Sequence, residues 1–549
     1  MIDLSTKTPE PLLFEISRPG RLGVELPDCD VPVKSIADLL PGASLRKNLD
    51  WPELSEPEVI RHFTHLSQDN YSIDSGFYPL GSCTMKYNPK INEEVARMSG
   101  FARLHPSTPD KHAQGALEVL YNMQEILTEI SGMDATSLQP AAGAHGELLG
   151  LMLIRAYHHD RGDEKRDTII VPESAHGTNP ASAARCGYKT VSIKSDTRGR
   201  TDIASLKAVL NDRVAGLMLT NPNTVGLFED EIKTLCDLIH EAGGLVYCDG
   251  ANMNALVGRA RPGDMGFDVM HFNLHKTFSS PHGGGGPGSG PVSVKASLIP
   301  YLPVPMVTKP VASTSPSPIP MGEGAGGEGS YRLNFDIPKT VGRIHGYYGQ
   351  FMCILRSYVY IMYYGKERLR DIADNAVLNA NYIRASLQND FDVAYNDICM
   401  HEIIFSAKRQ QCDYGVKALE IAKRIMDFGY HPPTIYFPLI VPEALMIEPT
   451  ETESLETIDA FIGAMKQIAR DCEENPEIVR SAPHYTSVRK LDEATAARQP
   501  CLCWTPPSPE DEDLEAALVV HGNDLTVSVA TRDEGCRREP GVQSCRRTR

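Results

Sequence analysis

The sequence lacks paired CxxC motifs, a secretory-type beginning and any long apolar run. Its 13 cysteines are scattered and odd in number, which indicates free thiols in a reducing compartment and gives no reason to expect a metal site. Residues 1–7 contain no basic stretch followed by an apolar core, so no secretory signal is expected. No run of about 18 apolar residues exists, so no membrane-spanning helix is expected either. These absences predict a cytoplasmic protein without a bound metal.

A surplus of positive charge is also missing. The chain has 54 Lys and Arg against 71 Asp and Glu, a formal net charge of -17, and its pI is near 5.5. Such a balance repels phosphate backbones and anionic lipid, and it therefore disfavours binding to nucleic acids or membranes. The acidity by itself identifies no partner.

The 549 residues are enough for two or three domains. Residues 1–60, rich in proline and polar breaks, indicate an extended N-terminal arm. A large α/β domain is expected over residues 61–341, a connecting helix over 342–365, and a smaller C-terminal α/β domain over 366–505. Residues 506–549 are acidic first and arginine-rich at the end, which is typical of a disordered tail.

Apolar runs alternate with amphipathic stretches in the first half of the chain. In Glu231–Ala242, apolar residues recur at the spacing of one helix face. Buried strands separated by such helices predict a mostly parallel sheet covered on both faces, which binds ligands at the carboxyl ends of its strands. The predicted strands are residues 167–171, 189–193, 214–220 and 244–248.

The strongest local signal for chemistry is Lys276. It follows a short apolar strand within His271–Phe278 and precedes the glycine-rich segment Pro281–Pro287. At the end of a strand, a lysine can project its amine into a pocket, where partial desolvation lowers the pKa of the amine and makes it a Schiff-base nucleophile. A lone lysine beside a glycine-rich segment is more often an ordinary surface residue, so the neighbouring signals decide.

Three further signals precede Lys276. The apolar run ending at Asp249 places a carboxylate at a strand end, where it could hold a proton on a pyridine nitrogen, although a turn or cap residue would look the same. Small residues in 140–147 begin a helical stretch that could bind phosphate, but they form neither a Walker loop nor a GxGxxG motif. His176 follows another strand and could stack on a ring or move protons, although a single loop histidine is more often structural.

The order of these signals is more specific than any one of them. A phosphate-type helix start, His176, Asp249 and Lys276 each follow a strand of the same predicted sheet. This order matches the large domain of aminotransferase-like enzymes that use pyridoxal phosphate (PLP), known as fold type I.

Several longer strings resemble the P-protein of the glycine cleavage system. The resemblance covers roughly residues 60–505, and beyond Trp504 none is recognisable. The P-protein occurs as one long chain or as two subunits, and a chain of this size that carries the lysine resembles the second subunit of the split form. The strings that carry the resemblance are residues 78–89, 249–255, 273–278, 281–287 and 446–451.

The resemblance implies decarboxylation of glycine and transfer of the aminomethyl group to the lipoyl arm of the H-protein. It also implies P-protein subunit 1 as a partner in an α2β2 assembly. Lys276 would form the Schiff base with PLP, Asp249 would pair with the ring nitrogen, and His176 would stack on the ring. The remaining implied contacts are Ala142, Gly143 and Ala144 at the phosphate, with Asn252, Asn273 and His275 as further cofactor contacts.

Two alternatives remain open. Another fold type I enzyme, such as an aminotransferase or a cysteine desulfurase, would share Lys276, Asp249 and the sheet. A desulfurase would also need a mobile catalytic cysteine, and none of the thirteen is identified as one. The other alternative is a non-catalytic paralogous subunit that has lost PLP, and the presence of both Lys276 and Asp249 argues against it.

Overall fold

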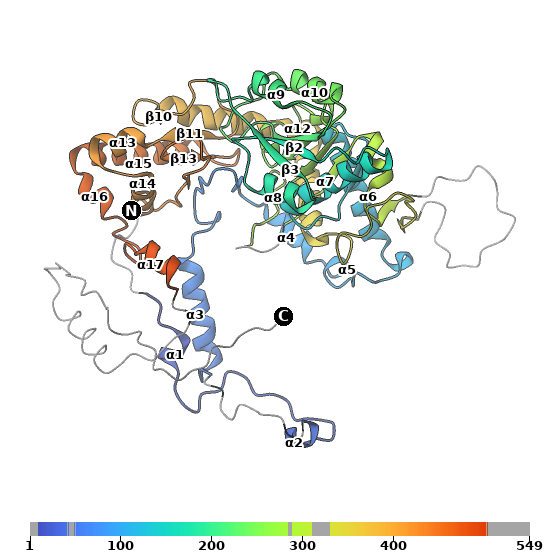
Figure 1. Cartoon of the computed structure of the whole chain (residues 1–549). Helices are drawn as coiled ribbons and strands as arrows, with labels where there is room; N and C mark the ends of the chain where they lie inside the picture. The colour runs from blue at the N-terminus through green and yellow to red at the C-terminus, as the bar shows by residue number, and fades with distance from the viewer. Residues whose placement is uncertain are drawn as a thin grey trace. The chain divides into compact units, whose positions relative to one another are not determined.

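A computed structural model describes residues 9–40, 42, 49, 51–283, 288–309, 330–500 and 502. The described residues form two compact units, one spanning His65–Lys490 and the other combining Glu10–Thr64 with the described residues from Leu491 onward. Figure 1 shows the elements in chain order by colour. The tail predicted over 506–549 and most of the glycine-rich segment after His282 lie outside the described residues.

Among the described residues, the larger sheet has seven strands in the order β1-β7-β6-β5-β4-β2-β3. Strands β2 to β6 are parallel to their neighbours, whereas β7 is antiparallel to both β1 and β6. The mostly parallel sheet is therefore confirmed, and β3 and β4 have their predicted bounds. The strands are β1 (Ala135–Ser137), β2 (Thr168–Pro172), β3 (Lys189–Ile193), β4 (Val214–Thr220), β5 (Leu245–Gly250), β6 (Val269–Phe272) and β7 (Val292–Val294).

Alternate side chains of these strands build a core on each face of the sheet. Leu217, Leu219 and Val246 pack on one face against α6, α10 and part of α12. Met218 and Tyr247 pack on the opposite face against α7 and α8. Because both faces are covered, the strand ends are where a ligand can reach the sheet. These helices are α6 (Gln114–Ser131), α7 (Gly143–Asp160), α8 (Thr178–Arg185), α10 (Ile232–Glu241) and α12 (Phe351–Leu387).

A smaller antiparallel sheet lies in the same compact unit, with its strands in the order β10-β11-β13-β12. Its core joins Phe405 and Leu445 to Ile383 of α12 and to Phe461 of α15. The elements of this lobe are β10 (Asp392–Val393), β11 (Ile403–Ser406), α13 (Lys408–Tyr414), α14 (Ala418–Asp427), β12 (Thr434–Ile435), β13 (Ala444–Ile447), α15 (Leu455–Glu474) and α16 (Pro476–Arg480).

Helix α12 differs from the helix expected over residues 342–365. It begins at Phe351 and continues to Leu387, with a break at Gly365, where φ is 70° and ψ is 166°. Gly349 has a φ of 93°, and a Cβ at that position would collide with the carbonyl oxygen of Leu138. The chain before Phe351 therefore follows a left-handed path that a helix cannot adopt.

The second compact unit contains short helices separated by extended chain, and residues 17–35 contain no helix or strand. None of the described helices combines the length and apolar character that crossing a bilayer requires. The remaining α-helices and strands of the described residues are α1 (Leu13–Ile16), α2 (Ile36–Leu39), α3 (Glu56–Asp69), α4 (Lys90–Ala96), α5 (Ser99–Ala102), α9 (Ile203–Val209), α11 (Pro262–Met265), α17 (Glu493–Arg498), β8 (Met306–Thr308) and β9 (Arg332–Asn334).

The central strand β4 provides a test of this core. Leu217 is fully buried, so Leu217→Ala removes apolar contacts and leaves a cavity, and we expect a loss of about 2–5 kcal/mol in unfolding free energy. Leu378, which is 65% exposed on α12, provides the control, since Leu378→Ala should change stability by less than about 0.5 kcal/mol. Urea denaturation followed by circular dichroism measures both, and equal effects would contradict the core assignment.

Candidate active site

The start of α7 lies at the edge of the larger sheet where its parallel strands end. Strand β1 runs in the same direction as β6, because both are antiparallel to β7. The chain therefore leaves β1 and enters α7 near the residues that follow β6. A Cβ on Gly143 would collide with Oδ1 of Asn273, so this helix start requires glycine. The first N–H groups of a helix have no partner within the helix and form a binding site for an anion.

Asp249 is a buried carboxylate near the end of β5, with 4% of its surface exposed. Its Oδ1 accepts a hydrogen bond from the Ala251 N–H at 3.0 Å and lies 3.4 Å from Nε2 of His271. On the other side of that imidazole, Nδ1 is 2.5 Å from the Tyr247 hydroxyl. Burial raises the pKa of Tyr247 well above its ordinary value, so the phenol keeps its proton and donates it to Nδ1. The imidazole proton is then on Nε2, facing Asp249.

Lys276 lies in the turn that follows β6. Its backbone N–H donates to the Asn273 carbonyl at 3.0 Å, and its side chain lines the cavity described below. The neighbouring His275 accepts from the Ser289 N–H through Nδ1 at 3.4 Å. Burial, followed by the charges of His282 and Lys276, lowers the pKa of His275 to about 3. His275 is therefore neutral at physiological pH.

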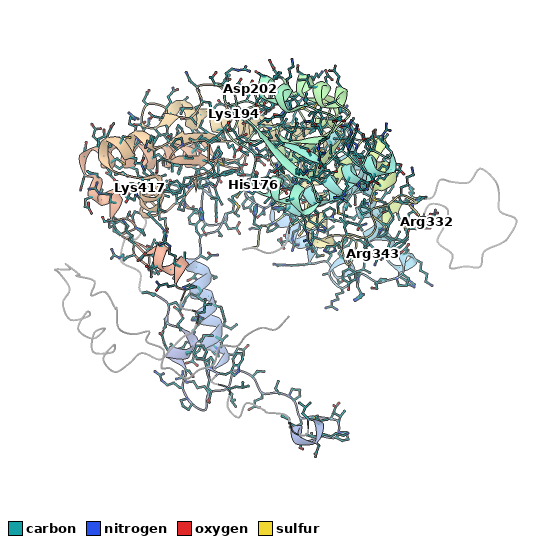
Figure 2. The ribbon with its side chains drawn as sticks, viewed as in Figure 1. His176, Lys194, Asp202, Arg332, Arg343 and Lys417 are labelled. Carbon is teal, nitrogen blue, oxygen red and sulfur yellow. The ribbon has the colours of Figure 1, made fainter. Side chains whose placement is uncertain are left out.

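His176 lies in the loop between β2 and α8 (Figure 2). The Thr178 N–H donates to its Nδ1 at 3.2 Å, and the Thr178 hydroxyl donates to Oε1 of Glu147 at 2.8 Å. The ring is exposed and makes an edge contact with Phe437, at 5.7 Å between ring centroids. These contacts hold an aromatic ring at the same sheet edge as Asp249 and Lys276.

A cavity of about 180 Å³ joins these side chains. Every residue singled out from the sequence lines it except Ala142, which immediately precedes α7. The hydroxyl of Thr220 also faces the cavity and is buried without a hydrogen-bond partner, which is a vacancy that a polar ligand could fill. The lining residues are Ser82, Gly143, Ala144, Glu147, His176, Thr178, Thr220, Thr224, Asp249, Ala251, Asn252, His271, Asn273, His275 and Lys276.

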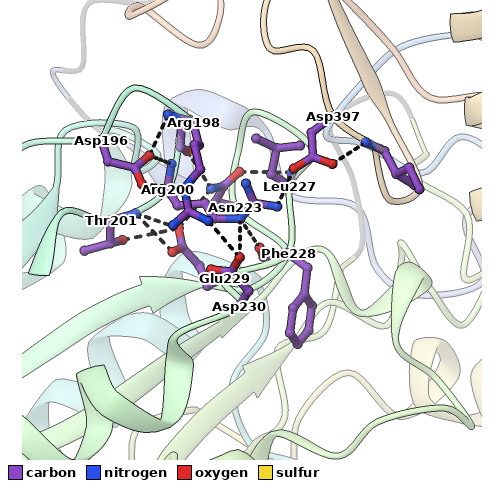
Figure 3. Close-up of polar contacts among 12 residues, drawn as sticks. Asp196, Arg198, Arg200, Thr201, Asn223, Leu227, Phe228, Glu229, Asp230 and Asp397 are labelled. Atoms are coloured by element: carbon purple, nitrogen blue, oxygen red, sulfur yellow. Dashed lines mark hydrogen bonds and ion pairs between the residues drawn. The ribbon is translucent and has the colours of Figure 1, made fainter.

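A polar network supports the loop that follows β4 and contributes Thr224 to the cavity. In Figure 3, Glu229 accepts from the Thr201 N–H at 3.0 Å and from the Asn223 amide at 2.9 Å. Arg200 extends the network to the smaller lobe through Asp397, at 2.9 Å. Burial raises the pKa of Glu229, so its bonds to the loop are needed to satisfy a carboxyl that is out of reach of water.

Sequence reasoning did not identify two groups of residues in and around the site. His271 and Glu147 stand inside strings already quoted, but their roles depend on which strands are neighbours. The other group, Glu402 and Glu448, comes from the smaller lobe and is fully buried. The Ser82 N–H donates to Oε2 of Glu402 at 2.9 Å and the Thr84 N–H donates to Oε2 of Glu448 at 2.8 Å, so both carboxyls contact the segment that contributes Ser82 to the cavity. Glu448 lies within the string 446–451 that carries the family resemblance, whereas no sequence signal indicated Glu402.

This arrangement can perform a limited set of reactions. A lysine amine can bond to an aldehyde, a buried carboxylate can stabilise a cationic ring nitrogen, and a helix start can bind a phosphate. The three groups line one cavity, with an aromatic ring beside it. They therefore fit a phosphorylated aromatic aldehyde better than a nucleotide or a metal-bound water.

Family models match most of the chain. Residues 33–312 match the model described as "Glycine cleavage system P-protein". Residues 372–484 match the model described as "Glycine dehydrogenase, C-terminal domain". The two matches together include the larger sheet and most of the smaller lobe.

Curated relatives and solved structures agree with these models. The chain is 54% identical to the probable glycine dehydrogenase (decarboxylating) subunit 2 of Listeria welshimeri, over 90% of this chain and 97% of that protein. It is equally identical to the protein of the same description from Bacillus velezensis, over 89% and 96%.

Among solved structures, the inhibitor-bound glycine decarboxylase (P-protein) of the glycine cleavage system has a TM-score of 0.65 at 20% identity, covering 79% of this chain and 95% of that one. The apo cysteine desulfurase from Thermococcus onnurineus NA1 has a TM-score of 0.54 at 14% identity, covering 72% and 95%. These likenesses confirm the predicted fold type I. On the strength of the matched models and the 54% identity, the chain belongs to the glycine cleavage system P-protein family.

Proposed function

We propose that the chain decarboxylates glycine with pyridoxal phosphate bound to Lys276 and transfers the aminomethyl group to the lipoyl arm of the H-protein. The observation that carries the proposal is the placing of Lys276 and Asp249 on one cavity at the carboxyl ends of β5 and β6. Family membership indicates which reaction this geometry supports, since the relatives at 54% identity are described as decarboxylating glycine dehydrogenases.

The residues of the cavity fit this cofactor. The unpartnered hydroxyl of Thr220 and the glycine-dependent start of α7 leave room and hydrogen-bonding capacity for a phosphorylated ligand. When bound, pyridoxal phosphate supplies an aldehyde that condenses with amines and a pyridine ring that withdraws electrons from the α-carbon of glycine. The Gly143 and Ala144 N–H groups would hold the phosphate, helped by the dipole of an 18-residue helix.

Asp249 would hold a proton at the pyridine nitrogen. A buried carboxylate favours the charged form of a cationic partner. The Ala251 N–H, together with the Nε2–H of His271, keeps that carboxylate oriented and satisfied. His176 would cover the ring face and limit the access of water, while Asn252 would stay fixed by its bond to the Pro222 carbonyl at 2.9 Å. Exclusion of water matters because a proton from solvent would quench the α-carbon after carbon dioxide has left.

The partners proposed are those that the family implies. Relatives described as subunit 2 support an assembly with P-protein subunit 1, for which we propose an α2β2 arrangement. The lipoyl-bearing H-protein would accept the aminomethyl group. The chain has a net charge of -17, so overall electrostatic attraction would not favour the docking of an acidic carrier. Docking would depend on local charge complementarity between the two surfaces.

A cysteine desulfurase activity is less consistent with the site. Among the described cysteines, Cys83 is the one on whose pKa the charge of Lys276 acts. Burial raises the pKa of the Cys83 thiol despite that charge, so the thiol stays protonated at neutral pH and is a poor nucleophile. The likeness to a desulfurase therefore extends to the fold alone.

The direct experiment is exchange of labelled bicarbonate into the carboxyl group of glycine. The purified chain is assayed with and without P-protein subunit 1, and with and without lipoylated H-protein. We expect exchange that depends on the lipoyl protein, together with the visible absorbance of a lysine Schiff base. Transfer of the amino group to a keto acid without lipoyl protein would instead indicate an aminotransferase.

Lys276→Ala should abolish both the visible absorbance and turnover, because among the described residues no other lysine lines the cavity. Lys194→Ala, which removes an exposed lysine (Figure 2), should change neither. Borohydride reduction followed by peptide mass spectrometry locates the pyridoxyl group. A pyridoxyl group on another residue of the wild-type chain would remove the basis of the assignment.

Asp249→Ala should keep part of the bound cofactor but lose most of the exchange rate. Loss of a buried hydrogen-bonding charge partner costs about 1.5–3 kcal/mol, equivalent to roughly 10- to 150-fold in rate. Asp237→Ala, at an exposed position on α10, is the matched control. An exchange rate for Asp249→Ala within about twofold of wild type would contradict the role given to this carboxylate.

Gly143→Ala should weaken cofactor binding, because the new Cβ would press against Asn273 and displace the N–H groups of the helix start. We expect at least about a tenfold rise in the dissociation constant, measured by absorbance titration of the apo-protein, as one misplaced set of phosphate bonds is worth 1.5 kcal/mol or more. Gly463→Ala, in an open position on α15, should leave binding unchanged. Equal affinities for the two variants would exclude α7 as the phosphate site.

A further inference from the structure

Residues 82–88 form a bridging segment between the smaller lobe and the two turns that carry Asp249 and Lys276. The segment begins beside β13, where the N–H of residue 81 donates to the carbonyl of residue 446 at 3.3 Å. Ser82 and Thr84 have φ values of 66° and 49°, which residues with a side chain rarely adopt. Such conformations persist where the surroundings impose them, and they cluster in functional segments. The proposed function uses none of the bridging segment.

Lys86 joins the bridging segment to the turn that follows β5. Its Nζ donates to Oδ1 of Asn254 at 2.8 Å, to Oε1 of Glu451 at 2.8 Å and to the Tyr360 hydroxyl at 3.2 Å. Nδ2 of Asn254 donates in turn to Oε2 of Glu451 at 3.3 Å. The Tyr360 hydroxyl donates to Oε1 of Glu451 at 2.9 Å. Asn254 is therefore held both by the lysine and by its carboxylate partner.

The network around Lys86 is closed to solvent. The side chains of Lys86 and Glu451 are 1% and 3% exposed. Burial lowers the pKa of Lys86, and the charge of Glu451 opposes this shift. Three acceptors around one nitrogen match an ammonium group, since a neutral amine would leave one of them without a hydrogen. A buried ion pair adds little to stability compared with apolar residues of the same size, but it can fix one arrangement of the segments around it.

The turn after β5 is held at regular intervals along its length. Oδ1 of Asp249 accepts from the Ala251 N–H at 3.0 Å. The Asn252 amide donates to a backbone carbonyl of the loop after β4 at 2.9 Å. Asn254 lies in the 3-10 turn that follows and is held by the network around Lys86. Because Asn254 is five positions after Asp249, a displacement of its amide would reach the carboxylate through a short stretch of chain.

Asn88 joins the bridging segment to the turn that carries Lys276. Its Nδ2 donates to the carbonyl and the hydroxyl of Ser279 at 2.8 and 2.9 Å. The Ser279 hydroxyl donates to the Tyr87 carbonyl at 3.1 Å, and the Ser279 N–H donates to the Lys276 carbonyl at 3.2 Å. The turn that carries Lys276 is therefore attached to the bridging segment through Ser279.

We propose that the bridging segment sets the separation of Asp249 and Lys276, with Lys86 and Asn88 as positioning residues. The proposal rests on the proposed function, in which Asp249 and Lys276 act on two ends of one cofactor. A carboxylate at the ring nitrogen and an amine at the aldehyde must match the fixed dimensions of the ring. A displacement of about 1 Å from such a geometry costs on the order of 100-fold in rate.

The position of the two anchors fits this role. Lys86 and Asn88 have a single residue between them, so the link between the two turns is short. The turns themselves follow neighbouring parallel strands, β5 and β6, which fix the direction of the chain but leave the side chains beyond the strand ends to local contacts. Neither anchor lines the cavity, so each acts through the turn that it holds.

Asn88→Ala tests the anchor of the Lys276 turn, because it removes both bonds to Ser279. We expect the dissociation constant of pyridoxal phosphate, measured by absorbance titration of the full chain, to rise about tenfold, within the range for the loss of two hydrogen bonds. Gln124→Ala is the matched control. The Gln124 side chain also joins distant segments by two bonds, to the Val307 backbone at 3.0 and 3.2 Å, and it lies outside the cavity lining. Equal affinities for the two variants would overturn the proposal.

Circular dichroism in the visible range reads the orientation of the cofactor ring without turnover. The absorbance of the ring becomes optically active when the protein holds it in an asymmetric site. At saturating cofactor, Asn88→Ala should show a dichroic signal per bound cofactor that differs from wild type, whereas Gln124→Ala should match wild type. An unchanged signal in Asn88→Ala would count against a positioning role.

A paired variant tests the anchor of the Asp249 turn. Lys86→Met alone would leave the Glu451 carboxylate buried without its cation and would destabilise the fold. Lys86→Met with Glu451→Gln removes both charges at similar side-chain size, so the unfolding midpoint should stay within about 4 °C of wild type. The lipoyl-dependent exchange rate should fall about tenfold or more, because Asn254 loses its anchor. A wild-type exchange rate in the paired variant would overturn the role of Lys86.

Tyr360→Phe covers the case in which the paired variant does not fold. It removes one hydroxyl from the network around Lys86, and we expect the exchange rate to fall about fivefold, as for the loss of one hydrogen bond. Tyr382→Phe, on the same helix, is the control, since it removes a hydroxyl that donates to Asp459 at 2.6 Å. Equal rates for the two variants would contradict the proposal.

Combination with Asp249→Ala separates positioning from a general loss of packing. If Lys86 acts through Asp249, the paired variant should change the residual rate of Asp249→Ala by less than about twofold, since the carboxylate that it positions is gone. Losses that multiply would show that the two sites are independent and would overturn the proposal. Failure of the proposed function would appear differently, as wild-type protein without lipoyl-dependent exchange.

Discussion

Burial of charge at the carboxyl edge of the larger sheet is the constraint on which the site depends. Asp249 has almost no contact with solvent, so its charge must be met by groups of the protein or of a ligand. The Ala251 N–H and His271 meet part of it, and Tyr247 fixes the proton of His271 from the opposite side. The parallel strands make this possible, because β5 and β6 end side by side and bring Asp249 and His271 into register.

The same constraint explains why the smaller lobe belongs to the active site. Burial lowers the pKa values of His275 and His282, on either side of Lys276 in the chain. Glu402 and Glu448, next to β11 and β13 in the smaller lobe, are fully buried carboxyls that accept hydrogen bonds from the segment around Ser82 and Thr84.

The chemistry of the family makes use of this enclosure. Decarboxylation needs a ring nitrogen that stays protonated, an amine that can change its protonation state, and little water. In the proposed function, Asp249 serves the first need, Lys276 serves the second, and His176 serves the third by covering the ring face. Arg200 joins the loop after β4 to the smaller lobe, through bonds to the Phe228 carbonyl and to Asp397.

The sequence by itself determined the sheet and most of the cavity. The bounds of β4 were predicted to the residue because a strand buried on both faces leaves a continuous hydrophobic signal. Those of β3, an edge strand with exposed residues, were predicted from its β-branched residues. Gly143, His176, Asp249 and Lys276 could be placed together because parallel strands end at a common edge. The helix expected over 342–365 was misplaced, since the positive φ of Gly349 is imposed by contact with Leu138. The partnership of Glu402 with Glu448 was decided only by the tertiary structure, since the two residues come from different strands of an antiparallel sheet and are bonded by a segment more than 300 positions away. No local pattern records a contact that long-range packing alone creates.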